Sequence, residues 1–216
     1  DYGEDRNLSE IISRFDPQHR AHIYDRVRNK TSINEVLAKY DGAIAFVDYE
    51  VGRLINALSN CGVLDDSLLI ITSDHGESLT EHEIYFDHHG LYDVSVHVPL
   101  IVRYPMLQQN DQIEGLVQHT DIVPTLVDTL GIKSTGFEFD GNSFLSLIQD
   151  DLDELHSAVY FEEADMERKS AVRTDEFKYI CAPSEEDMVC KRCGYTHGSR
   201  EELYNLKKDV EETRNI

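Results

Sequence analysis

Two residues that could bind a metal ion stand side by side at the end of an apolar run. The run spans residues 68–72, and Ser73, Asp74, His75 and Gly76 follow it. A short apolar run bounded by turn residues is typical of a strand buried in a parallel sheet. Ligands collect at the carboxyl ends of such strands, and carboxylate and imidazole groups both bind divalent cations. The pattern predicts a cation site at Asp74 and His75, although an Asx-capped turn would fit the tripeptide alone.

The segment after this run is rich in histidine. Five of the ten histidines lie within it: His75, His82, His88, His89 and His97. A loop that follows a strand is where binding and catalytic side chains usually sit. The concentration of imidazoles therefore favours a functional site over an isolated turn.

Several motifs, taken in order, resemble the sulfatase family of the alkaline-phosphatase-like superfamily. Three of them are residues 73–77, residues 88–93 and residues 98–101. Further matches keep the family's order, so the resemblance covers roughly residues 36–216: Tyr40, 47–54, 121–126, Asp140-Gly141 and 202–206. Each motif alone is weak, whereas the ordered set is specific.

The resemblance implies a fold and a cofactor. The fold class is α/β, with an alkaline-phosphatase-like, mostly parallel sheet flanked by helices and a small antiparallel C-terminal subdomain. In the family a divalent cation is held partly by a late Asp followed by Asn or His, which here correspond to Asp74 and His75. Calcium is the first expectation, with manganese or zinc as alternatives. The family's nucleophile, a formylglycine made from Cys or Ser, is expected in an N-terminal half outside these residues, because the chain begins at Asp1 rather than Met.

His88 and His89 are the candidates for contact with the substrate. In many sulfatases a lysine that contacts the sulfate precedes a Tyr-Glu or Tyr-Asp pair. This chain has His88 at the corresponding distance before Tyr92-Asp93. An imidazole could donate a hydrogen bond to the ester or a proton to the leaving oxygen. We therefore predict a catalytic and substrate-binding role for His88. His89 could take the same substrate-binding role, and a purely structural histidine is the alternative for both.

The resemblance implies a metal-dependent sulfuric ester hydrolase, acting on a sulfated small molecule or glycan. A phosphodiesterase or phosphonate hydrolase of the same superfamily is the alternative enzyme, because it uses the same Asp-His pair. A non-catalytic fragment or binding module is the third hypothesis. We expect the isolated chain to be inactive and to expose apolar surface that favours self-association.

Three of the four cysteines lie close together and precede a histidine. Cys181, Cys190, Cys193 and His197 have the spacing C-x8-C-x2-C-x3-H, and Cys-x-x-Cys is a common half of a zinc site. Three thiolates and one imidazole would form a closed, structural zinc site. A Cys181–Cys190 disulfide or free thiols would fit the same spacing.

The composition is strongly acidic, with 42 acidic and 20 basic residues and a net charge of −22. We expect no nucleic-acid partner, because phosphate binding requires a basic patch. No apolar run reaches the length of a membrane span and no signal peptide is visible, so we expect no membrane partner. The localisation stays open, and the family tendency is extracytoplasmic.

A long helix is predicted from Ser32 to Gly62, because apolar residues recur at three- and four-residue steps over about six turns. Ser32 or Asn34 would cap its start, and Gly62 its end. We expect its apolar stripe to pack on a sheet, with the helix and the strand ending at Asp74 forming half of a parallel β-α-β unit.

We expect two domains. Residues 1–150 would be the C-terminal part of the catalytic α/β domain, with residues 1–34 as a peripheral helical segment. Residues 155–216 would be the small antiparallel subdomain, because short runs typical of strands recur at 158–162, 171–174 and 177–181. Between these, a second strand at 97–104 and helices at 121–130 and 143–148 are predicted.

Overall fold

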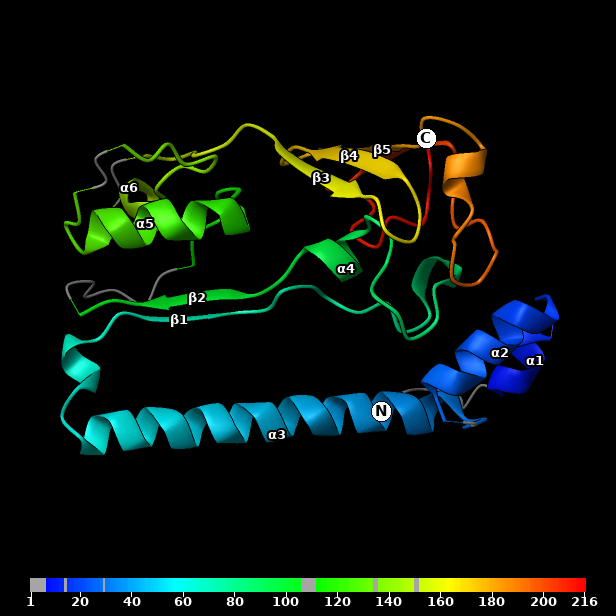
Figure 1. Cartoon of the computed structure of the whole chain (residues 1–216), viewed down its shortest axis with the longest axis horizontal. Helices are drawn as coiled ribbons and strands as arrows, with labels where there is room; N and C mark the ends of the chain where they lie inside the picture. The colour runs from blue at the N-terminus through cyan, green and yellow to red at the C-terminus, as the bar shows by residue number, and fades with distance from the viewer. Residues whose placement is uncertain (1–6, 14, 29, 106–111, 134–135, 150–151) are drawn as a thin grey trace. The chain divides into compact units, whose positions relative to one another are not determined.

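The computed structural model describes residues 7–13, 15–28, 30–105, 112–133, 136–149 and 152–216 (Figure 1). The chain forms two compact units. The first comprises residues 1–105, 163–169 and 182–200, and the second comprises residues 106–162, 170–181 and 201–216. This division differs from the predicted boundary near residue 150, because the chain returns twice to the first unit. Residues 1–6, part of the predicted peripheral segment, lie outside the described residues.

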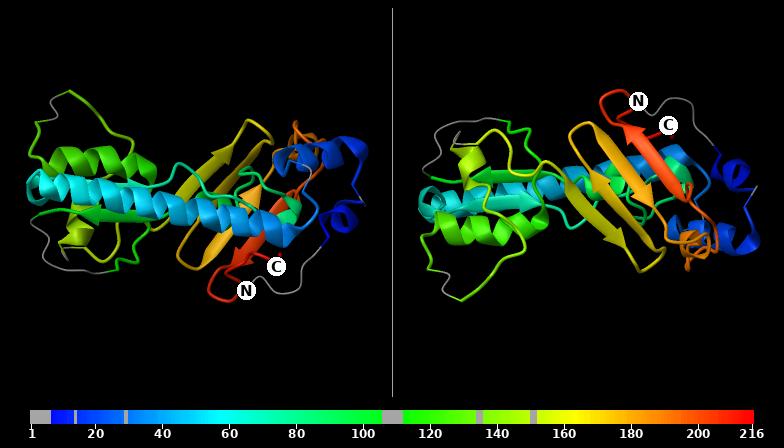
Figure 2. Two further views of the ribbon diagram at one scale, coloured as in Figure 1. Left: turned by 90° about the horizontal axis from the view of Figure 1, so that it is seen from below. Right: turned by 90° about the horizontal axis from the view of Figure 1, so that it is seen from above.

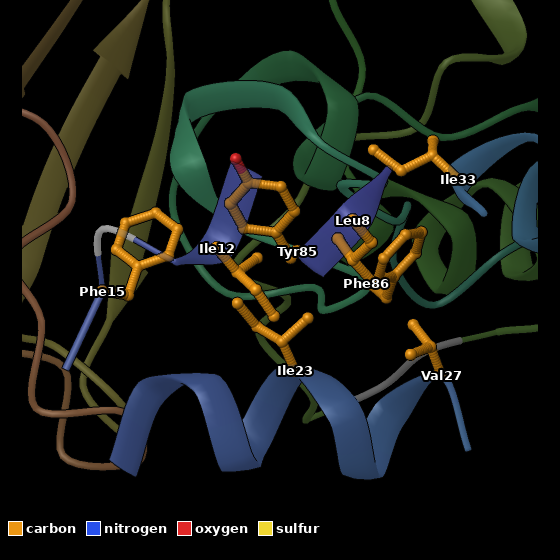
Figure 3. Close-up of a cluster of buried hydrophobic side chains, with 8 residues drawn as sticks. All are labelled: Leu8, Ile12, Phe15, Ile23, Val27, Ile33, Tyr85 and Phe86. Carbon is orange, nitrogen blue, oxygen red and sulfur yellow. The ribbon is translucent and has the colours of Figure 1, made fainter. Parts of the chain in front are cut away.

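The first unit opens with two short helices that close over a small core. Helix α1 spans Leu8–Ile12 and helix α2 spans Pro17–Arg26. Asp16 caps α2 by accepting from the backbone N–H groups of Gln18 and His19, and Pro17 fits the first turn, where its missing N–H costs nothing. Eight buried side chains pack together here (Figure 3): Leu8, Ile12, Phe15, Ile23, Val27, Ile33, Tyr85 and Phe86. The core thus joins the N-terminal helices to the histidine-rich segment.

The predicted long helix is present as α3, Ile33–Asn60. Ser32 caps it by accepting from the Glu35 N–H, and Gly62 follows its end with a φ of +70°. The helix runs without a break in every view (Figure 2). Its predicted packing on a sheet is not observed, because the apolar stripe is largely exposed: Tyr40 38%, Ile44 55%, Val47 59% and Leu54 56%.

Strands β1 and β2 carry the predicted site. The turn η1 (Leu64–Asp66) leads into β1 (Leu69–Thr72), which pairs with β2 (Leu100–Arg103). The pairing is antiparallel, with Thr72 opposite Leu100. Within the described chain this sheet has two strands, so these strands do not form the expected parallel arrangement. β1 still ends directly before Ser73 and Asp74, as predicted.

The segment after β1 folds through close backbone contacts. It contains the 3-10 turn η2, Glu81–Glu83, and the short helix α4, Asp93–Val96. The N–H of Gly76 donates to the Ser95 carbonyl over 2.8 Å. A Cβ atom at residue 76 would clash with the Val94 carbonyl oxygen. Glycine is therefore required where the strand meets α4.

The second unit contains helices built around a buried carboxylate. The turn η3 (His119–Asp121) leads into α5 (Ile122–Thr129), and α6 spans Leu145–Ile148. Asp121 is fully buried. Its oxygens accept from the Gln118 N–H, the Asn142 N–H and His156 Nε2, at 2.7, 2.8 and 2.9 Å. Both helices lie where the sequence predicts them, and Asp121 is structural.

Four strands form an antiparallel sheet, in the order β3-β4-β5-β6 (Figure 2). They span Val159–Glu163, Lys169–Arg173, Phe177–Cys181 and Glu201–Asn205. The β4–β5 and β5–β6 pairs are antiparallel. Three strands match the predicted runs, and the antiparallel sheet expected from the resemblance is present. β6 was not predicted, because residues 201–205 lack a clear alternation of apolar and polar residues.

The segment that returns to the first unit after β5 is mostly irregular. It contains the turn η4, Glu186–Met188. Beyond η4, the Cys190 N–H donates to the Tyr195 carbonyl and the Gly194 N–H donates to the Cys190 carbonyl. These bonds close a tight loop that contains Cys190 and Cys193.

Among the described residues, no helix is long and apolar enough to cross a membrane.

Candidate active site

Asp74 and His75, the two residues predicted to bind a cation, lie side by side at the end of β1. His75 Nε2 is 3.7 Å from Asp74 Oδ2. His75 Nδ1 is 2.7 Å from the Gly76 carbonyl oxygen, which as an acceptor requires the ring proton on Nδ1. The Nε2 lone pair is therefore available to a metal. Two ligand atoms held about 2.0–2.5 Å from one cation lie about 3–4.5 Å apart, so this spacing fits.

His88 and Glu77 form a group with His75. The rings of His75 and His88 stack, with centroids 4.0 Å apart and an interplanar angle of 23°. His88 Nδ1 is 3.7 Å from Glu77 Oε2. His75, Glu77 and His88 each offer a donor atom within 4.8 Å of the others. Partial burial raises the pKa of Glu77.

A buried carboxylate, Asp87, holds the histidine-rich segment in place. Asp87 is 1% exposed. Three side chains contact it: Arg26 pairs with Oδ1, His22 Nε2 is 3.1 Å from Oδ2, and Arg192 Nη1 is 3.1 Å from Oδ2. Its burial would raise the pKa of Asp87, but the neighbouring His89, the His88 N–H and Arg26 outweigh burial and hold the pKa far below its usual range. Asp87 is thus an ionised anchor between helix α2, the turn that contains Arg192 and the histidine-rich segment.

His89 lies in a different environment from His88. It is 4% exposed, and its ring contacts that of His197, with centroids 4.9 Å apart. Its donor atom lies within 4.8 Å of those of Glu167, Cys190 and His197. The substrate-binding role of His89 stays a prediction, and the structure places its side chain in a buried cluster with these residues.

The structure brings together three of the four predicted zinc ligands. Cys193 Sγ is 3.3 Å from His197 Nε2, and Cys190 lies in the buried cluster with His89 and His197. The thiol of Cys193, with help from His197, lowers the pKa of Cys190 far below its usual range. Cys181 lies on β5 in the second unit, and its place among the zinc ligands stays a prediction. The cysteines are free in the structure, which does not support the Cys181–Cys190 disulfide.

The sequence did not indicate that Arg26 and Glu167 contact buried residues of the first unit. Arg26 reads as part of a solvated helix face, yet it pairs with buried Asp87. Glu167 lies in an acidic stretch without a motif, yet it is 1% exposed. The only usable signal is charge: basic residues are scarce in a chain of net charge −22, so each has many potential acidic partners.

Comparison with known proteins decides the family. The family model described as Sulfatase matches residues 8–132, and the model described as N-sulphoglucosamine sulphohydrolase, C-terminal, matches residues 80–216. The chain belongs to the sulfatase family. The predicted resemblance is thereby confirmed, and so is the class of sulfuric ester hydrolases to which its relatives belong.

Individual relatives agree. Arylsulfatase K of Bos taurus is 38% identical over 100 residues, covering 46% of this chain and 18% of that protein. Arylsulfatase K of Danio rerio is 29% identical over 212 residues, covering 94% of this chain and 39% of that protein. N-acetylglucosamine-6-O-sulfatase of Bacteroides thetaiotaomicron is 27% identical, covering 84% and 32%. The chain thus spans between 18 and 39% of the length of these sulfatases.

Solved structures confirm the fold. A protein in complex with its substrate D-glucosamine-2-N,6-O-disulfate matches 80% of this chain with a TM-score of 0.66 and 26% identity, over 34% of its own length. A 2-O GAG sulfatase matches the whole chain with a TM-score of 0.71 and 24% identity, over 45% of its own length. The alkaline-phosphatase-like assignment therefore holds, even though the sheets described here are antiparallel.

Proposed function

We propose that this chain supplies the late half of the active site of a metal-dependent sulfatase, which hydrolyses sulfate esters of a small molecule or glycan. One observation carries the proposal: His75 lies where β1 ends, beside Asp74 on one side and with donor atoms of Glu77 and His88 nearby. The separation of 3.7 Å between Asp74 Oδ2 and His75 Nε2 supports a shared cation. Family membership and the relatives that act on sulfated sugars support the substrate class.

Asp74 and His75 would hold the divalent cation. When bound, the cation would stabilise the negative charge that develops on the ester oxygens. The chain's own part is to present the ligands: the Gly76 carbonyl fixes the imidazole of His75, and the side chain of Asp74 is 88% exposed and accessible. Calcium is the expected ion because it prefers oxygen ligands such as the Asp74 carboxylate. Manganese or zinc is the alternative, because these ions also bind imidazole.

His88 would act on the substrate. Its side chain is 44% exposed, and the stacked ring of His75 fixes its orientation. From this position an imidazole can donate a hydrogen bond to a sulfate oxygen or a proton to the leaving oxygen. In an acidic protein these donors and the cation would offset the repulsion of an anionic ester.

The nucleophile is proposed to lie outside these 216 residues, as a formylglycine made from Cys or Ser. The coding sequence upstream of Asp1 tests this directly. A C/S-x-P-x-R motif there would support the sulfatase proposal. A lone Ser or Thr nucleophile would instead identify a phosphodiesterase or phosphonate hydrolase, and would overturn it.

The isolated chain is proposed to have no catalytic activity, because half of the cation ligands and the nucleophile are proposed to lie outside these 216 residues. An assay with an aryl sulfate and added calcium or manganese should give no turnover above background. Turnover that disappears in an Asp74→Asn variant would show that the 216 residues form a complete enzyme, which would contradict the proposed division of the site.

A further inference from the structure

The first unit contains a second group of metal-binding side chains, separate from Asp74 and His75. Its members come from four distant parts of the chain, and all are buried: His19, His89, Glu167, Cys190, Cys193 and His197. The donor atoms of His89, Glu167, Cys190 and His197 all lie within 4.8 Å of one another. Those of His19, Cys193 and His197 do so as well. Soft thiolates together with imidazoles select zinc among common metals.

The backbone around Cys190 and Cys193 forms a tight turn. Gly194 has a φ of +73°, and its N–H donates to the Cys190 carbonyl over 2.7 Å. The Cys190 N–H donates to the Tyr195 carbonyl over 2.9 Å. A tight turn closed in this way after Cys-x-x-Cys brings both thiols to one side, and glycine allows the left-handed residue that follows. Cys193 Sγ lies 3.3 Å from His197 Nε2.

Several buried nitrogen atoms of the histidines in this group have no hydrogen-bond partner. Neither ring nitrogen of His89 has a hydrogen-bond partner, and the same is true of His197 Nδ1. Asp87 Oδ2 is 3.7 Å from His89 Nδ1, which is beyond hydrogen-bond distance. Buried polar atoms are nearly always satisfied in folded proteins. A metal ion would satisfy one nitrogen of His89, and it would explain why an imidazole is buried there.

Charge balance excludes the carboxylate from the ligand set. Glu167 Oε2 already pairs with Lys169 Nζ at 2.6 Å, and Lys169 is 2% exposed. Two thiolates neutralise a divalent cation, so adding a carboxylate would leave excess buried negative charge. The best-balanced set is therefore two cysteines and two histidines, with Glu167 and Lys169 as a neutral neighbouring pair.

We propose that Cys190, Cys193, His197 and His89 bind one structural zinc ion. The site does not include Cys181, and it does not depend on the sulfatase proposal. Four protein ligands would leave no position open for chemistry, as in structural zinc sites generally. Because His89 directly follows His88, the ion would fasten the histidine-rich segment to the loop of residues 190–197.

Metal analysis of the chain purified under reducing conditions tests the site. We expect about one zinc per chain, as a closed four-ligand site requires. Replacement by Co²⁺ should give the intense visible bands of tetrahedral cobalt together with thiolate-to-cobalt charge-transfer absorption. This readout uses the unmutated chain, so a variant that fails to fold cannot obscure it. No bound zinc and no tetrahedral cobalt spectrum, or a Cys190–Cys193 disulfide, would overturn the proposal.

Matched variants test the ligand set. Cys190→Ser and His89→Ala should each weaken zinc binding by more than about tenfold, since loss of even an outer partner of a ligand can cost that much. Cys181→Ser, Glu167→Gln and His97→Ala should keep the full zinc content and the cobalt spectrum. Loss of zinc in Cys181→Ser with retention in His89→Ala would overturn the assignment in favour of the set of three cysteines.

Discussion

At the scale of single residues, Asp87 joins the parts that the site needs. Its carboxylate contacts Arg26, His22 and Arg192, and its backbone N–H and carbonyl bond to Ser78 over 3.1 and 2.9 Å. The N–H of the next residue, His88, donates to Asp87 Oδ1 over 3.0 Å. A buried ion pair adds little net stability, but removing one partner leaves an uncompensated charge. The position of His88 therefore depends on this carboxylate.

Asp87→Asn should lower the free energy of unfolding by about 3–5 kcal/mol, because Arg26 and Arg192 would lose their buried counter-charge. Urea unfolding followed by circular dichroism measures the change. Glu50→Gln is the matched control, since Glu50 pairs with Arg53 on an exposed turn of α3. Such a surface pair contributes at most about 1 kcal/mol. Equal effects of the two substitutions would contradict the anchoring role of Asp87.

Residues adjacent in sequence were the predictable part of the site. Asp74 and His75 follow one strand directly, so local pattern sufficed to place them side by side. His89, Glu167 and Cys190 come from separate segments, and no local pattern specifies that they meet. The zinc hypothesis found the local pair Cys190 and Cys193 and the nearby His197. Its fourth ligand was Cys181, which lies on β5, whereas the set proposed above has His89 in that place.

At the scale of elements, two glycines differ in how closely other parts of the backbone approach them. Gly76 lies where the chain leaves β1, and the backbone of α4 approaches it so closely that a side chain cannot fit. Gly42 lies in the exposed first half of α3, where a Cβ would meet nothing within 4 Å. The same substitution should therefore have opposite effects at the two positions.

Gly76→Ala should destabilise the chain by about 1–3 kcal/mol, because the backbone of α4 must move away. Gly42→Ala should stabilise it by about 0.5–1 kcal/mol, because alanine loses less backbone entropy in a helix. Thermal or urea unfolding of the two variants measures both signs. A neutral Gly76→Ala would show that the close approach between the strand end and α4 is not needed.

Element positions were mostly predictable, whereas partners were not. The cap at Ser32 and the glycine at Gly62 define α3 in sequence, and both lie where predicted. β1 and β2 also lie in the predicted runs. Their antiparallel pairing was not predicted, because an apolar run does not determine whether the adjacent strand is parallel or antiparallel.

At the scale of the whole molecule, α3 exposes large apolar side chains around much of its surface. Phe46 and Tyr49 are each 64% exposed, in addition to the stripe that contains Ile44, Val47 and Leu54. A helix that is apolar on several sides is normally buried. The chain spans 18 to 39% of the curated relatives named above. Part of a longer sulfatase could cover this helix.

We predict that the isolated chain self-associates through α3 at salt concentrations that screen its charge of −22. Sedimentation velocity should show a sedimentation coefficient that rises with protein concentration. Val47→Lys should shift the distribution toward the monomer, because a charge then lies in the apolar stripe. Ser59→Lys adds the same charge in the last turn of α3, beyond its exposed apolar residues, and should leave association unchanged. A wild-type monomer at all concentrations would refute the prediction.

The cation site at Asp74 and His75 is the central claim, and paramagnetic NMR tests it most directly. Mn²⁺ titrated into the zinc-loaded chain broadens only signals from nearby nuclei, so weak binding by half a site is still detectable. The amide signals of Asp74, His75 and His88 should broaden first, while that of His119, another exposed histidine, keeps its intensity. Asp74→Asn should abolish the selective broadening, and Asp66→Asn should not. Broadening that spreads over the acidic surface, or that survives in Asp74→Asn, would contradict the account.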